Sequence, residues 1–193
     1  FDWSTIRWLK NKFSPQFFVP KGFIKQYSLF TAQNAIELDW GEHCAFCSLD
    51  IFFIPALHWS LRYIGDYNKT LWGGYWFCSS KKSIYFAGDT AFGTGQLFQD
   101  IKTAFGSPSV ACLPIGAYKP DYIMKASHLA PYEAVQAHKI LHPKQSIALH
   151  HYTFCLSDEG WLEPQQDLAE ALKMQNLPAH VFKVLLPGHH LSF

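Results

Sequence analysis

The sequence predicts an α/β fold in which helices pack against sheets and functional side chains lie in loops at strand ends. Short apolar segments typical of strands fill much of the first half, whereas strands and helices alternate through the second half. Three of the apolar segments end in a histidine or an aspartate. The chain has 193 residues, 49% of them apolar, so we expect a single domain over residues 1–193 with a sizeable core.

Two helices and several short strands are expected in the first half. Asp2 is a preferred N-cap residue for a helix that includes Ile6 and Leu9 and ends before Pro15. A second helix is expected over residues 22–29. The polar segment 79–82 separates two apolar runs and predicts a hairpin. The expected strands cover residues 16–20, 34–38, 45–54, 72–78 and 83–86.

Helices alternate with strands after the hairpin. Apolar side chains recur at helical spacing between residues 96 and 105, at Leu97, Phe98, Ile101 and Ala104. Pro131 favours the first turn of a second helix. The expected helices cover residues 96–105, 131–141 and 163–174, and the expected strands cover residues 109–114, 145–149 and 181–185.

Charge and composition exclude some classes of partner. The formal net charge is +1, only 16% of residues are charged, and no basic block occurs, so nucleic acid is not an expected partner. Aromatic residues make up 17%, which suits a core and also contact with apolar ligands or a membrane surface. No run of 18 apolar residues predicts a transmembrane helix, and the first residues are not typical of a signal peptide.

The cysteines are more informative about the redox compartment of the protein than about a metal site. Their number, five, is odd, and their spacing is irregular. Cys44 and Cys47 have the spacing of half a zinc site, but the sequence offers no second pair. Free thiols favour a reducing compartment. We therefore expect a cytoplasmic protein, with peripheral contact to a membrane as a further expectation.

Three strand ends offer ligands of the kind that zinc takes. His58 follows the apolar run from residue 51, Asp89 follows residues 83–88, and His150 follows residues 145–149. Imidazole and carboxylate are the ligands of hydrolytic zinc sites, which leave one position open for water. Taken singly, each histidine is also compatible with a hydrogen-bonded polar role, and Asp89 with a turn or helix cap. Their recurrence at three strand ends favours a metal site.

His128 is a candidate for the chemistry beside such a metal. It lies in a loop before the helix that begins at Pro131. One interpretation is an exposed loop histidine, and the other is a proton donor or oxyanion partner. A nucleophilic serine or cysteine triad is the main alternative mechanism, but the sequence lacks the Gly-x-Ser-x-Gly elbow.

Several motifs occur in one order along nearly the whole chain. They are Pro55-Ala-Leu-His-Trp-Ser, Phe86-Ala-Gly-Asp-Thr, Leu113-Pro-Ile-Gly-Ala-Tyr, Met124-Lys-x-x-His and Ala148-Leu-His. Together they resemble the metallo-β-lactamase superfamily, and more narrowly its branch of phospholipases D that hydrolyse N-acylphosphatidylethanolamine. Leu-Pro-Ile-Gly-Ala-Tyr gives the resemblance its specificity, because it is not a general motif of the superfamily.

The resemblance implies a fold, a cofactor and a reaction. The fold would be an αβ/βα sandwich of the metallo-β-lactamase type with two zinc ions at one edge. His58 would bind the first zinc, Asp89 would bridge both, and His150 would bind the second. His128 would lie beside the reacting phosphate. The implied activity is a metal-dependent phosphodiesterase of the phospholipase D type that acts on lipid-like, N-acylated phospholipid substrates.

One signature of the superfamily is absent from these residues. The motif His-x-His-x-Asp-His, which supplies most zinc ligands, does not occur in the sequence. In the family it lies just upstream of the helix matched by residues 2–12. We therefore expect this chain to correspond to the C-terminal portion of such an enzyme, with the sandwich incomplete at the N-terminus. With three ligands in place of the full set, we expect no stable two-metal site from this chain alone.

Two alternatives stay open from the sequence. The same fold supports many chemistries, so hydrolysis of a lactone or another ester is a second interpretation. A non-catalytic remnant that serves as a binding or structural module, with an incomplete metal site, is a third. Zinc content separates the enzymes from the remnant, and substrate assays separate the two enzymes.

Overall fold

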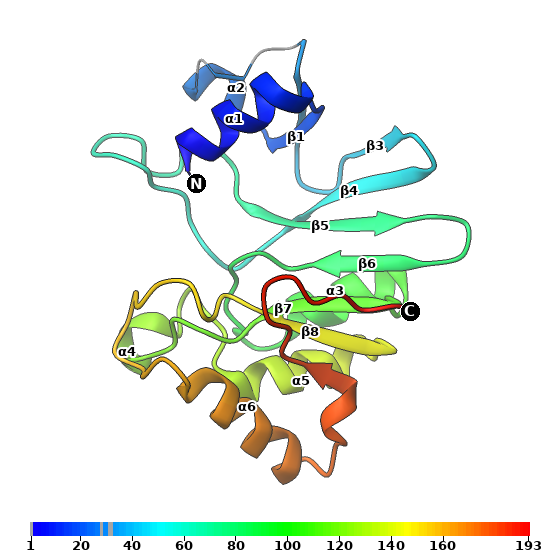
Figure 1. Cartoon of the computed structure of the whole chain (residues 1–193), viewed down its shortest axis with the longest axis vertical. Helices are drawn as coiled ribbons and strands as arrows, with labels where there is room; N and C mark the ends of the chain where they lie inside the picture. The colour runs from blue at the N-terminus through cyan, green and yellow to red at the C-terminus, as the bar shows by residue number, and fades with distance from the viewer. Residues whose placement is uncertain (1, 28, 31–32) are drawn as a thin grey trace.

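Strands and helices form a mixed α/β structure, as the sequence predicted (Figure 1). The structure is a computed structural model, and it describes residues 2–27, 29–30 and 33–193. Within these ranges the strands form a two-stranded sheet, β1-β2, and a seven-stranded sheet of order β3-β4-β5-β6-β7-β8-β9.

The predicted elements are present, with shifted bounds. The first half contains α1 (Trp3–Phe13), β1 (Phe17–Pro20), α2 (Phe23–Gln26), β2 (Ala35–Leu38), β3 (His43–Phe46), β4 (Leu49–Pro55), β5 (Gly73–Cys78) and β6 (Ser83–Phe86). The second half contains α3 (Gln96–Phe105), β7 (Val110–Pro114), α4 (Asp121–Met124), α5 (Pro131–Leu141), β8 (Gln145–Leu149), α6 (Glu163–Met174), a 3₁₀ turn (Ala179–Val181) and β9 (Phe182–Lys183).

Some boundaries differ from the sequence prediction for physical reasons. The predicted strand 45–54 is a hairpin, because Cys47 adopts φ 56° and a two-residue turn pairs Phe46 with Leu49. No glycine or proline marks that turn in the sequence. The helix predicted over 22–29 is only the four residues of α2, and Ser28 lies outside the described residues. α4 was not predicted, and β9 is shorter than the strand predicted over 181–185.

The direction of the strands places several strand ends at one edge. β4, β5 and β6 pair antiparallel, whereas β6, β7 and β8 pair parallel. β4 therefore runs in the same direction as β6, β7 and β8, and the loops that follow these four strands leave the same edge. This is the condition for bringing together residues that are distant in sequence.

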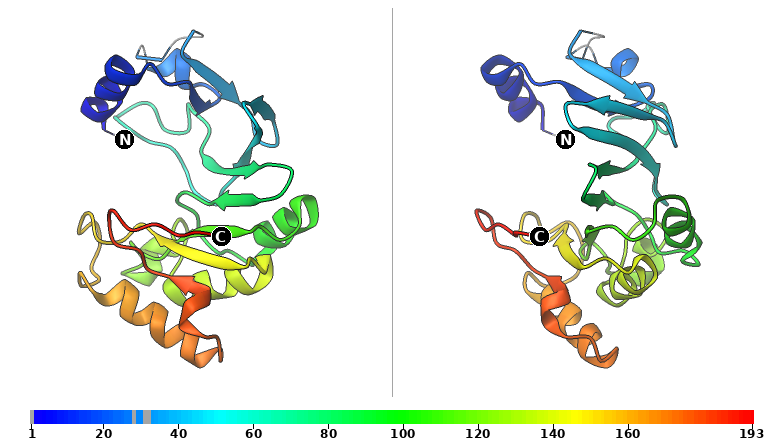
Figure 2. Two further views of the ribbon diagram at one scale, coloured as in Figure 1. Left: turned by 45° about the vertical axis from the view of Figure 1, so that its right-hand side comes forward. Right: turned by 90° about the vertical axis from the view of Figure 1, so that its right-hand side faces the viewer.

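Three helices cover one face of the large sheet (Figures 1 and 2). Phe98 of α3, Val135 of α5 and Leu168 of α6 share one buried cluster with Trp76 and Leu113 of the sheet. Burying a large apolar side chain stabilises a fold by roughly 1.5–3 kcal/mol. This cluster is therefore the main source of stability for the strands that carry the strand-end residues.

A smaller cluster forms at the N-terminal end. Val19, Tyr27, Phe30 and Ala35 are its buried members. Asp2 caps α1 as predicted, since its carboxylate accepts hydrogen bonds from the N–H groups of Ser4 and Thr5. The Tyr75 hydroxyl on β5 donates to the carbonyl of Phe18 over 2.9 Å. That bond links the small sheet to the large one.

Candidate active site

The four residues predicted from the sequence come from four loops at one edge of the large sheet. His58 lies in the loop after β4, Asp89 follows β6, and His150 comes directly after β8. His128 lies between α4 and α5. The His128 ring is 5.2 Å from the His58 ring and 5.4 Å from the His150 ring, measured between centroids. The fold therefore gathers side chains that are 92 positions apart in sequence at the extremes (58 to 150).

Two hydrogen bonds fasten the His58 loop to the Asp89 loop. The N–H of Leu57 donates to Thr90 Oγ1 over 3.0 Å, and the N–H of Ala91 donates to the Leu57 carbonyl over 2.9 Å. Thr90 is fully buried. Thr90 therefore helps to position the loop that carries Asp89. Asp89 itself is 44% exposed and free to face a ligand.

His150 is held in an unusual backbone conformation. Its φ is +57°, in the left-handed region that few non-glycine residues adopt. Its Nε2 lies 3.6 Å from Asp89 Oδ1, so these two predicted ligands face each other. His151 is turned aside, and its Nε2 lies 3.2 Å from the Ala148 carbonyl. Only His150 of these two consecutive histidines therefore faces Asp89.

Burial keeps His128 neutral. Burial lowers the pKa of His128 to about 4, with Asp89 opposing the change and His150 and His58 adding to it. All three partners therefore act electrostatically on this ring. A hydrogen bond from Trp59 Nε1 to Ser127 Oγ, 3.1 Å long, ties the His128 loop to the His58 loop.

Three histidines leave a buried ring nitrogen without a hydrogen-bond partner among the described residues: His58 and His128 of this site, and His151, which is turned aside from it. The two atoms in the site are His58 Nε2 and His128 Nδ1. His58 Nδ1 lies 2.7 Å from the Trp59 carbonyl, which fixes the proton on Nδ1 and leaves the Nε2 lone pair available. Buried polar atoms are nearly always paired in native proteins, so such atoms indicate a missing ligand.

The donors fit a zinc-type ion in chemical type but are not assembled as a cage. Two imidazoles and a carboxylate are what zinc accepts, and the free His58 Nε2 has the orientation that a carbonyl partner gives to metal-bound histidines. Yet in residues 2–27, 29–30 and 33–193 no group of three or more His, Cys, Asp or Glu side chains is arranged to hold a metal ion.

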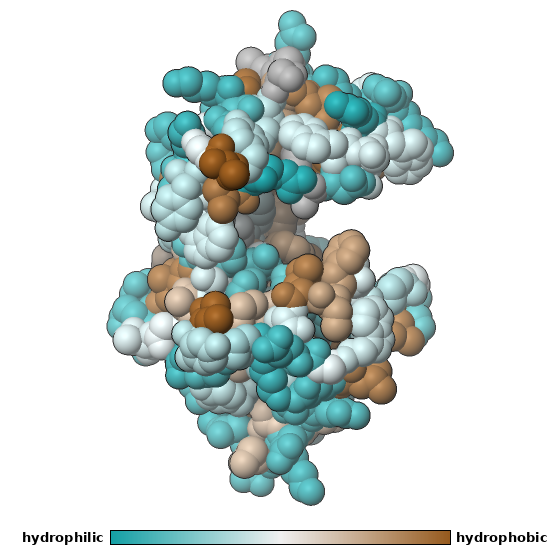
Figure 3. Space-filling model, turned by 90° about the vertical axis from the view of Figure 1, so that its left-hand side faces the viewer, coloured by the Kyte–Doolittle hydropathy of each residue, from teal (hydrophilic) through white to brown (hydrophobic). Residues whose placement is uncertain are grey.

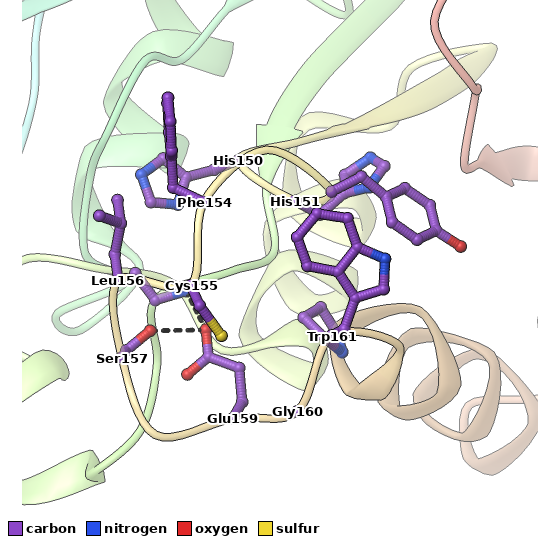
Figure 4. Close-up of a pocket in the computed structure, with 12 residues that line it drawn as sticks. His150, His151, Phe154, Cys155, Leu156, Ser157, Glu159, Gly160 and Trp161 are labelled. Carbon is purple, nitrogen blue, oxygen red and sulfur yellow. Dashed lines mark hydrogen bonds between the residues drawn. The ribbon is translucent and has the colours of Figure 1, made fainter.

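A pocket opens beside His150 (Figure 4). Its cavity volume is about 30 Å³, which is room for about one water molecule. The close-up shows His150 and Phe154 on one side, Trp161 on the other, and Glu159 below them.

Sequence reasoning missed two residues that shape this site. A Cβ atom on Gly116 would lie 1.9 Å from the His150 carbonyl oxygen, so only glycine fits there. Glu159 is a buried carboxylate in the loop after β8. Gly116 stands within the Leu-Pro-Ile-Gly-Ala-Tyr motif, which was a signal for its importance, whereas nothing in the sequence marks Glu159.

Comparisons with known proteins identify the family of this chain. The model of the β-lactamase superfamily domain matches residues 4–151, which is well over half of the chain. The chain is 35% identical over 146 residues to N-acyl-phosphatidylethanolamine-hydrolyzing phospholipase D 1 of Caenorhabditis elegans, covering 73% of this chain and 41% of the relative. It is also 35% identical over 173 residues to the mitochondrial N-acyl-phosphatidylethanolamine-hydrolyzing phospholipase D of Saccharomyces cerevisiae, covering 86% of this chain and 37% of that relative.

A solved structure supports the same fold. The metallo hydrolase Igni18 of Ignicoccus hospitalis superposes with a TM-score of 0.70 at 22% identity, covering 97% of this chain and 72% of that one. The chain spans about two fifths of the length of the two phospholipase relatives. The fold and the resemblance stated from the motifs are confirmed, and the chain belongs to the metallo-β-lactamase superfamily of metal-dependent hydrolases.

Proposed function

We propose that this chain contributes His58, Asp89 and His150 as metal ligands to a zinc-dependent phosphodiesterase of the phospholipase D type. The observation that supports the proposal is that four side chains lie close together at one sheet edge: His58, Asp89, His128 and His150. Buried ring nitrogens of His58 and His128 lack partners among the described residues. The two phospholipase relatives support N-acyl phospholipids as the substrate class.

The side chains at this edge would have different roles in the reaction. Bound zinc would supply charge neutralisation at the phosphoryl oxygens and activation of water. Asp89 and His150, 3.6 Å apart, would present oxygen and nitrogen donors from neighbouring loops. The neutral His128 ring, half-buried among them, would donate its single N–H to a phosphoryl oxygen or to the leaving group.

Exposed apolar side chains around the site favour a lipid-like substrate. Ile64 in the loop after β4, Tyr122 on α4, and Phe154 and Leu156 after β8 are largely exposed. Figure 3 views the side of the molecule that carries these loops, and apolar and aromatic side chains stand on it above and below a hollow. Exposed apolar groups at a rim of this kind favour contact with the interface of a bilayer.

Membrane contact is part of this proposal and can be measured. Within the part of the chain that the structure describes, no helix is long and apolar enough to cross a bilayer. Co-sedimentation with phosphatidylcholine vesicles should show binding that weakens several-fold in Ile64→Ser and Tyr122→Ser variants, since each loses apolar contact. The exposed Met174→Ser variant, on α6, is the control. Equal binding by all three variants would contradict the rim as the contact surface.

Metal content and substrate choice test the enzymatic proposal. Purified protein should be assayed for zinc, then for hydrolysis of an N-acylphosphatidylethanolamine and of a lactone. The proposal expects phosphatidic acid and N-acylethanolamine from the lipid and no turnover of the lactone. Lactone hydrolysis alone would favour another esterase of the same fold. Absence of zinc and of turnover, also when the corresponding N-terminal segment of a phospholipase relative is supplied, would favour a non-catalytic module.

A further inference from the structure

Glu159 is a buried carboxylate that accepts hydrogen bonds from groups in two loops. Its Oε1 accepts hydrogen bonds from the N–H of Ala117 over 2.5 Å and from the Ser157 hydroxyl over 2.8 Å. Its Oε2 accepts from the N–H of Lys119 over 3.2 Å. Hydrogen bonds to an ionised carboxylate are about twice as strong as neutral ones. Glu159 therefore joins the loop after β8 to the loop after β7.

The charge of Glu159 is satisfied by main-chain and hydroxyl donors. The nearby Lys119 ammonium pairs instead with Glu163. Ala117 adopts φ +60°, a left-handed conformation that costs about 1 kcal/mol or more for a residue other than glycine. That conformation directs its N–H at Glu159 Oε1. The strained turn and the buried carboxylate thus stabilise each other.

The loop after β7, which Glu159 holds, is in close contact with the backbone of His150. The N–H of Ile115 donates to the Leu149 carbonyl over 3.1 Å, which extends the β7–β8 ladder to the base of both loops. One residue later, Gly116 approaches the His150 carbonyl so closely that any Cβ would overlap it. His150 has its own left-handed backbone at this point. A shift of the Gly116–Ala117 segment must therefore move the backbone of His150.

We propose that Glu159 is a positioning residue: it holds the Gly116–Ala117 turn against His150 and so keeps His150 Nε2 directed at Asp89. The inference rests on the proposed metal site for the role of His150, but the clamp itself is a property of this chain. Figure 4 shows Glu159 beneath the pocket that His150 borders, with Ser157 bonded to it.

Amide hydrogen exchange and histidine NMR test the clamp without metal. In Glu159→Ala the Ala117 amide should exchange at least about tenfold faster than in the wild type, because it loses its acceptor. The ring resonances of His150 should shift in the same variant. Asp167→Ala is the matched control, since it removes the bond from the Tyr118 hydroxyl to the same loop without touching Ala117. Unchanged Ala117 exchange in Glu159→Ala would overturn the clamp.

Zinc affinity tests the consequence for the site. Competition with a chromophoric chelator should show affinity about 10–100-fold weaker in Glu159→Ala, the range typical of residues that orient metal ligands. Glu159→Gln keeps one carbonyl oxygen for Ala117 and should lie between the wild type and Glu159→Ala. Asp167→Ala should stay near the wild type. Faster Ala117 exchange with unchanged zinc affinity and unshifted His150 resonances would show a purely structural role and overturn the positioning.

Two further outcomes are distinguishable. Should circular dichroism show that Glu159→Ala is unfolded, Glu159→Gln decides the question through the same exchange and resonance measurements. Should the wild-type protein bind no zinc, the proposed metal site fails in this chain. The exchange rate of Ala117 and the resonances of His150 still confirm or overturn the clamp in that case.

Discussion

His128 is half-buried and His138 is buried in two different regions, and burial lowers the pKa of each to about 4. His138 lies in the helix-covered core, where its Nδ1 is 2.8 Å from Ser146 Oγ and its ring stacks on Phe182. His128 lies at the sheet edge, and its Nδ1 has no partner among the described residues. A shifted pKa therefore does not separate a functional histidine from a structural one. The two histidines differ in whether Nδ1 is hydrogen-bonded and in whether the ring lies beside His58 and His150.

The contrast extends to the two regions as a whole. The core is assembled mainly from apolar side chains, and the Tyr85 hydroxyl is its one described polar side-chain group without a partner. The edge combines left-handed residues, exposed apolar side chains and unpaired ring nitrogens. Groups at the edge should thus matter for activity more than for stability, and groups in the core the reverse. The four predictions below test this division, from the largest expected effect to the smallest.

Asp89→Asn should lower kcat/KM by about a thousandfold in a preparation that hydrolyses an N-acyl phospholipid, because it removes a charged ligand from the metal site. Its free energy of unfolding should change by less than about 0.5 kcal/mol, since Asp89 is partly exposed. Steady-state kinetics and urea denaturation measure the two effects. Asp100→Asn, an exposed carboxylate on α3, is the control. Retained turnover in Asp89→Asn would reject its role as ligand.

His138→Ala should have the opposite profile. It leaves a cavity and deprives the buried Ser146 hydroxyl of its partner, so the free energy of unfolding should fall by about 2–4 kcal/mol. His58→Ala should cost less than about 1 kcal/mol, because its buried Nε2 contributes no hydrogen bond within the described structure. Urea denaturation of both variants makes the comparison. Equal losses would erase the distinction between the two regions.

Stability should fall as the pH is lowered from about 6.5 toward 4. The pKa of His138 is about 4 in the folded state because of burial, whereas an unperturbed histidine titrates near 6.5. Between these values the unfolded chain binds more protons, so His138 contributes fully above pH 6.5 and its contribution is lost on acidification. Between pH 7 and 5 the loss should be about 1–2 kcal/mol larger in the wild type than in His138→Phe. The exposed His180→Asn variant should follow the wild type.

Tyr85→Phe should leave stability unchanged or raise it by up to about 1 kcal/mol. The Tyr85 hydroxyl is the one described core group that is buried without a partner, and burial raises its pKa. Tyr118→Phe should instead cost about 1 kcal/mol, because the Tyr118 hydroxyl donates to Asp167 over 2.6 Å. Thermal melts compare the two variants. A clear loss of stability in Tyr85→Phe would show that the Tyr85 hydroxyl is hydrogen-bonded. The described core would then have no unpaired polar side chain, and its difference from the sheet edge would be larger.

Much of the fold and the site followed from local sequence patterns. Apolar runs ending in His58, Asp89 and His150 predicted strands that deliver polar groups to one edge, and the structure brings these residues together. The hairpin at Cys47 was missed because its turn carries no glycine or proline signal. Glu159 was missed because its three donors come from residues that are 2 to 42 positions away, and no spacing encodes them.

The α/β class, the helix-covered core and the residue types that could bind a metal follow from local sequence patterns, because periodicity and strand-end chemistry are local properties. Only the tertiary structure decided which histidines keep an unpaired nitrogen, how closely Gly116 approaches His150, and that Glu159 joins the two loops. Those features depend on contacts between strands that are neighbours in the sheet and distant in the chain. His128 and His138 are the same residue type, and their tertiary surroundings make one a candidate for catalysis and the other a part of the core.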